Sequence, residues 1–231
     1  MAKKTQTEEN NEEKYARWYF EELQTAGYVK RIDREVETIS VLPEFKHKRV
    51  KRFVKKDNVE EDFTLLKAVN YTYDFRIIWT DKAINLFTEI FNPQGAFLFG
   101  EPFFISHYIK INNVIEIVSY IDVKPHTMAA RFGGKLSTFY TFPFIQKFLL
   151  HTRGLFINKM IPVNMGKYGI NTCMFAQTFT PQRYLFTDKG KDLRKIRFKK
   201  NTLNNFISQR ENLINEILIK DNHKSQQKGL F

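Results

Sequence analysis

The sequence of 231 residues contains one cysteine, Cys173, and its five histidines are scattered along the chain. A single thiol cannot form a disulfide within the chain, and a zinc site of cysteines or histidines needs several such ligands close together. We therefore expect neither feature, and a reducing, cytoplasmic setting fits this composition.

Long hydrophobic runs are also missing. No stretch approaches the ~18 uninterrupted apolar residues of a membrane-spanning helix. The first residues, MAKKTQTEENNEEK, are polar and lack the apolar segment of a signal peptide. These absences predict a cytoplasmic protein that makes no contact with a membrane.

The sequence does hold an excess of positive charge and enough apolar residues for a core. Hydrophobic residues make up 42% of the chain, and 37 lysines and arginines outnumber 25 acids to give a formal net charge of +12. Such a charge attracts polyanions, and nucleic acid is the partner we expect. The alternative is a basic protein without such a partner.

Apolar periodicity and turn residues predict an α/β chain. We expect helices over residues 12–26, 81–91, 141–153 and 201–220. We expect strands over residues 35–42, 70–79, 103–111, 114–123 and 155–163. The strand at 114–123 is apolar or β-branched along nearly all its length, as in the centre of a sheet.

Charged residues gather in two regions. Residues 46–56 hold seven lysines or arginines and no acid, and the acidic run DNVEED follows at 57–62. This opposition of charge is typical of a solvated loop or hairpin. Residues 181–200 hold eight basic residues against two aspartates. We expect contacts with the DNA backbone from basic residues of these two regions and from His126 and Lys147. The residues of the two regions are Lys48, Arg49, Lys51, Arg52, Arg183, Arg194 and Arg197.

The residues that suggest chemistry are Asp74, Asp122 and Lys124. Residues two apart in a strand share a face, so Asp122 and Lys124 point the same way at the end of strand 114–123. If the strand that carries Asp74 pairs beside it, two carboxylates and one amine converge. Carboxylate oxygens suit Mg²⁺ or Mn²⁺, and a bound divalent ion lowers the pKa of its water for phosphodiester hydrolysis. The lysine would orient or deprotonate that water.

This arrangement resembles the PD-(D/E)XK nuclease superfamily, above all its small phage and transposon endonucleases and Holliday-junction resolvases. Tyr73-Asp74-Phe75 stands at the position of the family's first metal-binding aspartate. Ile121-Asp122-Val123-Lys124-Pro125 stands at its (D/E)-x-K motif, and a helix and a strand follow as in the family. The resemblance covers residues 12–163 and implies a mixed sheet flanked by helices, the restriction-endonuclease-like core.

The resemblance also implies further ligands. Glu13 on the first helix corresponds to a third acid, with Glu12 as its rival, and the backbone carbonyl of Val123 to a metal ligand. The family's usual proline is Tyr73 here, and the two aspartates lie 48 residues apart rather than on strands joined by a short connection. Residues 81–111 must therefore form an insertion, or Asp74 is the wrong acid and Asp81 or Glu116 takes its place.

These observations predict a disordered lead-in at 1–11, a nuclease-like core at 12–163, a basic extension at 164–220 and a loose tail at 221–231. The predicted function is a Mg²⁺-dependent endonuclease acting on double-stranded or branched DNA, possible as a homodimer, in the cytoplasm of a bacterial host if a phage encodes it. One alternative is a non-catalytic nucleic-acid-binding accessory protein on a nuclease-like scaffold. Another is a structural phage protein whose D-x-K triplet is coincidental.

Overall fold

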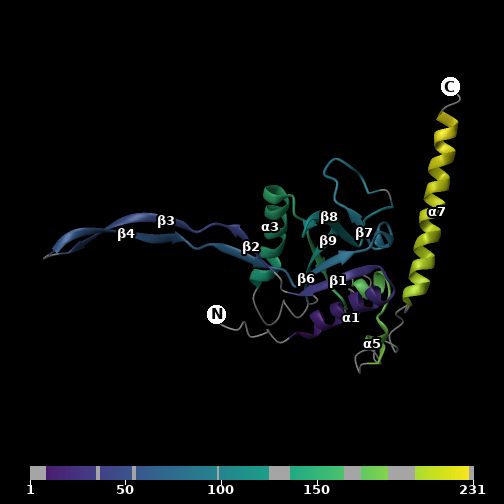
Figure 1. Cartoon of the computed structure of the whole chain (residues 1–231), viewed down its shortest axis with the longest axis horizontal. Coiled ribbons are helices and arrows are strands. Elements are labelled where there is room, and N and C mark those ends of the chain that lie inside the picture. Colours follow the sequence, from purple (N-terminus) through teal and green to yellow (C-terminus); the bar gives the residue numbers. More distant parts are fainter. Residues whose placement is uncertain are drawn as a thin grey trace.

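The computed structural model describes residues 9–34, 37–53, 56–97, 99–124, 136–163, 173–186 and 201–228. A central sheet lies between helix α1 (Asn11–Thr25) and helix α3 (Leu136–Arg153). Two elements project from opposite sides of this body (Figure 1): a long β-hairpin and the C-terminal helix α7 (Leu203–Lys228). The predicted α/β class with a mixed sheet and flanking helices is confirmed.

The central sheet has six strands. Its order is β1 (Val29–Arg34), β6 (Phe75–Trp79), β9 (Val114–Val123), β8 (Phe104–Ile111) and β7 (Thr88–Ile90), and β10 (Ile157–Met160) also pairs with β9. Neighbouring strands run antiparallel, except that β7 is parallel to β8 and β10 is parallel to β9. The apolar strand β9 is therefore the centre of the sheet, as its composition predicts.

Strand β9 has two partners along the same side. Its first half pairs with β8, where Asn112 and Asn113 form the connecting turn with positive φ of 48° and 65°. Asparagine tolerates this left-handed backbone, so the dipeptide suits a tight hairpin. The second half of β9 pairs with β10 over residues 120–123. These pairings leave the carboxyl end of β9 within the sheet.

Helix α1 begins and ends where its sequence indicates. The Asn10 side chain accepts a hydrogen bond from the N–H of Glu13 at 2.8 Å and caps the first turn, and Gly27 has a φ of 81° just past the last turn. Its buried residues recur every three or four positions, so one stripe faces the sheet. They are Tyr15, Ala16, Tyr19, Phe20 and Leu23.

The two faces of the sheet carry separate parts of the core. Odd-numbered residues of β6 and β9, such as Trp79 and Ile121, pack with α1, while even-numbered ones, such as Ile78 and Tyr120, pack with Phe142 and other residues of α3. Successive strand residues alternate between faces, so the residue number sets the side. Asp122 therefore belongs to the face that α3 covers.

The projecting β-hairpin is called the arm here. It consists of β3 (Phe45–Phe53) and β4 (Lys56–Leu66). A short two-stranded sheet of β2 (Thr38–Leu42) and β5 (Val69–Thr72) joins the arm to the body, and Arg153 of α3 donates to the carbonyl of Ser40 in β2 at 2.5 Å. The sequence predicted a solvated loop or hairpin at 46–62, and the hairpin is the form observed.

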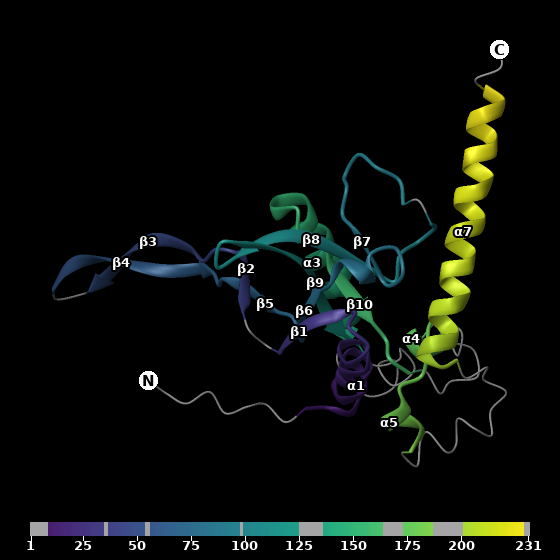
Figure 2. The same ribbon diagram turned by 45° about the vertical axis from the view of Figure 1, so that its right-hand side comes forward.

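Smaller elements complete the described chain. A 3₁₀ turn η1 (Asp81–Ala83) precedes β7, and the short helices α4 (Met174–Gln177) and α5 (Gln182–Leu185) pack beside α1. The first residues of α7 dock on the body through Leu203 and Phe206, and Figure 2 shows the rest of the helix extending away. None of the helices described is long and apolar enough to traverse a bilayer.

Several expected boundaries were wrong. Residues 29–34, which lie before the expected strand at 35–42, form strand β1, because tertiary pairing with β6 stabilises a segment with little apolar periodicity. The expected strand 70–79 is two strands interrupted at Tyr73 and Asp74. The expected helix 81–91 is a single 3₁₀ turn followed by β7, which pairs with β8.

Three helix and tail predictions also need correction. Helix α3 begins at Leu136, so Pro143 lies inside it rather than near its start. The lead-in is shorter than 1–11, because Asn10 caps α1 and Asn11 begins it. Helix α7 continues to Lys228, so most of the predicted loose tail at 221–231 is helical.

Candidate functional site

Asp74 lies at the break between β5 and β6, beside the end of β9. Its backbone N–H donates to the carbonyl of Ile121 at 3.0 Å, and its carboxylate Oδ2 accepts from the N–H of Val123 at 2.6 Å. Because β6 begins only at Phe75, the side chain supplies the acceptor that a longer β6 would have offered to Val123. The predicted pairing of the two strands is confirmed, and it brings Asp74 beside the D-x-K segment.

Asp122 and Lys124 point to the same face, as their spacing predicts. The Lys124 Nζ lies 2.6 Å from Asp122 Oδ2 and 5.7 Å from the centre of the Phe142 ring of α3. Asp122 is only 2% exposed. The backbone N–H of Lys124 donates to the carbonyl of Met160 in β10 at 2.8 Å, which holds the residue at the end of the sheet.

The pKa of Asp74 reflects both its burial and the negative charges near it. Burial, as the largest cause, and the charge of Asp122 together raise the pKa of its carboxyl to about 7, against the lowering effect of the hydrogen bond from the Val123 N–H. The charge of Glu13 adds to the rise, and Lys124 opposes it. Asp122, Glu13 and Lys124 are therefore all within electrostatic reach of Asp74.

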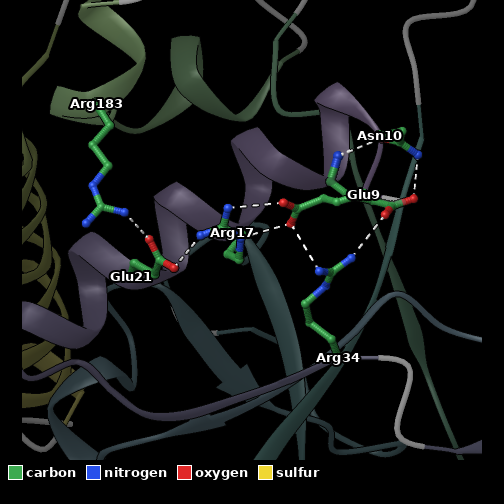
Figure 3. Close-up of polar contacts among 7 residues, drawn as sticks. Glu9, Asn10, Arg17, Glu21, Arg34 and Arg183 are labelled. Atoms are coloured by element: carbon green, nitrogen blue, oxygen red, sulfur yellow. Dashed lines mark hydrogen bonds and ion pairs between the residues drawn. The ribbon is translucent and has the colours of Figure 1, made fainter. Parts of the chain in front are cut away.

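Glu13 reaches this group from the first turn of α1. Its carboxylate contacts Asn10 and lies 3.5 Å from Arg34 at the end of β1. Arg34 also forms an ion pair with Glu9, and Glu9 in turn pairs with Arg17 of α1 (Figure 3). Glu12 instead acts on the pKa of Tyr15. Of the two glutamates that the sequence left as rivals, Glu13 is the one whose charge acts on Asp74.

Tyr71 of β5 is a neighbour that sequence reasoning missed. Its buried hydroxyl lies beside Asp122, and burial, together with the charges of Asp122 and Asp74, raises the pKa of the phenol. The signal in the sequence was weak, because an aromatic residue in a predicted strand is normally a core residue. The residue belongs to the strand pair that joins the arm to the body.

The competing acids lie elsewhere. Glu116 pairs with Lys30 at 2.6 Å near the other end of β9, and Asp81 begins the exposed turn η1. Arg76, two residues after Asp74, pairs with Asp33 rather than with Asp74, at 3.0 Å. Asp74, rather than Glu116 or Asp81, is therefore the acid that lies beside Asp122.

The predicted DNA-contacting residues do not form one described surface. Lys48, Arg49 and Lys51 lie on the arm and pair with acids of β4. Lys147 is exposed on α3, and Arg183 pairs with Glu21 of α1 at 2.6 Å (Figure 3). His126, Arg194, Arg197 and the side chain of Arg52 lie outside the described residues.

The two aspartates offer the hard oxygen ligands that Mg²⁺ and Mn²⁺ prefer. In the described ranges no three histidine, cysteine, aspartate or glutamate side chains lie close enough to form a complete metal site by themselves. Mg²⁺ is commonly held by one or two carboxylates and otherwise by water and substrate, so the pair is chemically sufficient. The raised pKa of Asp74 shows negative charge that a cation at this place would offset.

Comparisons with known proteins found no match, whether to family models, to curated proteins or to solved structures.

Proposed function

We propose that this protein is a metal-dependent nuclease that hydrolyses DNA phosphodiester bonds at the group formed by Asp74, Asp122 and Lys124. The observation that carries the proposal is the pairing of β6 with β9, which places two acids from distant parts of the chain beside a lysine. Two buried carboxylates are costly together unless a cation joins them, and binding sites accept such costs for function.

The order of elements gives additional support to the resemblance with PD-(D/E)XK nucleases. A helix, three antiparallel strands, a helix and a parallel strand follow one another as α1, β1, β6, β9, α3 and β10. The long interval between the aspartates consists of η1, β7 and β8, and β8 extends the same sheet on the far side of β9. An insertion of this kind leaves β6 and β9 adjacent, so the length of the interval does not argue against Asp74.

Each residue has a role in this proposal. Asp74 and Asp122 would hold a Mg²⁺ or Mn²⁺ ion, with the Val123 carbonyl as a further ligand, and such an ion activates water and polarises the phosphoryl group. Glu13 would contribute its negative charge rather than a ligand, because the described residues hold no group of three acids that could bind a metal. The amine of Lys124 donates to the attacking water or to a phosphoryl oxygen and offsets developing negative charge. The ring of Phe142 lies beside the Lys124 amine and the hydroxyl of Tyr71 beside Asp122, so both limit the access of water to the pair.

The test is cleavage of supercoiled plasmid and of branched DNA with Mg²⁺ or Mn²⁺. We expect the wild type to cut, and Asp122→Asn and Lys124→Ala each to lower the rate at least ~100-fold. Glu116→Gln is the matched control, since it removes an acid from the other end of the same strand, and it should keep full activity. Equal rates for the wild type and the Asp122→Asn variant would refute the proposal.

A second candidate is a nucleic-acid-binding protein without catalysis, and the formal net charge of +12 favours it independently of the aspartates. It predicts DNA binding that weakens with salt and is unchanged in the Asp122→Asn variant. Metal-dependent cutting separates the two candidates.

A further inference from the structure

The arm projects from the body without support from another element. Figures 1 and 2 show it extending away from the central sheet in both views. Among the described residues, β3 and β4 pair only with each other. A two-stranded ribbon is at best marginally stable alone in water, and it normally needs a third strand or a covering surface. The arm is therefore a segment that a partner would stabilise.

Apolar side chains on the arm point to the same conclusion. Five large hydrophobic residues of β3 and β4 are each between 53% and 64% exposed. They are Phe45, Val50, Val59, Leu65 and Leu66. Phe45, Leu65 and Leu66 lie at the base of the arm. Val50 and Val59 lie on opposite faces of its middle, since Val50 pairs with Glu60 and Val59 with Lys51. A partner that packs on either face of the arm would therefore cover exposed apolar area.

The charges of the arm decide what kind of partner fits. The described basic side chains lie on β3 and the acidic ones on β4 or just before β3, so each strand presents mainly one sign. The basic residues are Lys46, Lys48, Arg49 and Lys51, and the acidic residues are Glu44, Glu60, Glu61 and Asp62. The two sets cancel, and where the basic residues of β3 lie, the acidic residues of β4 beside them would repel phosphates. DNA is therefore a poor partner for the described shaft of the arm, whereas a surface with the same pattern reversed is a good one.

The arm of a second copy has that pattern. Two ribbons can stack about a two-fold axis that runs along the arm or about one that runs across it. The first arrangement places β3 of each copy over β4 of the other, so basic strands face acidic strands. The second places β3 over β3 and opposes like charges. Opposed like charges disfavour an interface, so only the first arrangement is electrostatically complementary.

We propose that the arm binds the arm of a second copy of this chain, as a two-fold dimer in which β3 of each copy lies over β4 of the other. The intramolecular ion pairs Lys48–Glu60 and Arg49–Glu61 remain compatible with it, because exposed ion pairs rearrange at little cost. Both bodies then lie at the same end of the paired arms. The proposal does not depend on the nuclease activity.

The decisive variant exchanges the charges of the two strands. It carries Lys48→Glu, Arg49→Glu and Lys51→Glu on β3 together with Glu60→Lys, Glu61→Arg and Asp62→Lys on β4. Every ion pair within the arm keeps opposite signs, so the hairpin should fold as in the wild type. We expect this exchanged variant to dimerise with itself but to form no mixed dimer with the wild type, because β3 and β4 would then meet like charges.

Light scattering after gel filtration gives the mass, and native mass spectrometry of mixtures gives the mixed species. The wild type at tens of micromolar should have twice the monomer mass of 27.5 kDa, without metal or DNA. Lys147→Glu, on the exposed surface of α3, is a control that should still dimerise and should mix with the wild type. A monomeric wild type, or statistical mixing of the exchanged variant with the wild type, would overturn the proposal. A monomer whose DNA binding is lost in the exchanged variant would identify DNA as the partner instead.

Discussion

Replacing Asp74 by asparagine should stabilise the metal-free protein at neutral and alkaline pH. The pKa of Asp74 in the fold is raised to about 7 from its ordinary value of 3.8, so the folded state disfavours the ionised carboxylate. Its contribution to stability is most favourable below pH 3.8 and is lost as the pH rises to about 7. Asparagine resembles the protonated acid, and its side-chain oxygen still accepts from the N–H of Val123.

The size of the effect follows from the two pKa values. One pKa unit corresponds to about 1.4 kcal/mol, so above pH 7 the variant should gain roughly 4 kcal/mol over the wild type in free energy of unfolding. At pH 5 the gain should shrink to less than half of this value, and below the ordinary pKa of 3.8 it should fall towards zero. For a chain of this length each kcal/mol moves the melting temperature by ~2–4 °C, so the rise at pH 8 is roughly 8–16 °C.

The assay is thermal or urea unfolding in the presence of EDTA across pH 4 to 8, with Asp62→Asn on the exposed arm as the control. The control should follow the wild type at every pH. A variant that is less stable than the wild type at pH 8, or equally stable at all pH values, would show that burial and Asp122 do not act on Asp74 in this way.

Three further predictions address the metal and the fold. Mn²⁺ should raise the melting temperature of the wild type and of Glu116→Gln but not of Asp74→Asn or Asp122→Asn, because a ligand that binds only the folded state stabilises it; equal shifts in all four proteins would contradict a site at these aspartates. Leu23→Ala should cost about 3 kcal/mol in urea unfolding, since Leu23 is fully buried between α1 and the sheet; a change below about 1 kcal/mol would mean that this part of the core is loosely packed. Gly27→Ala should cost about 1 kcal/mol, because the added Cβ meets no atom within 4 Å but the φ of 81° strains any residue other than glycine; an unchanged stability would show that the turn after α1 relaxes.

Some features of this protein follow from local sequence. Asn10 and Gly27 bound α1, Asn112-Asn113 makes the turn between β8 and β9, and the opposed charge blocks at 46–62 form a hairpin. In each case neighbouring residues determine the outcome, because capping, left-handed turns and alternation act over a few positions. The face shared by Asp122 and Lys124 is a consequence of the same kind.

Other features were decided only by tertiary structure. β1 is a strand because β6 lies beside it, and the carboxylate of Asp74, at the break before β6, takes the N–H of Val123. The contact of Tyr71 with Asp122 needs the strand pair at the base of the arm, which no local pattern indicates. Pairing between distant strands depends on the packing of the whole sheet. Residue types and spacing therefore identified the acids and the lysine as candidates. Only the order of the strands in space determined that Asp74, and not another acid, lies beside Asp122.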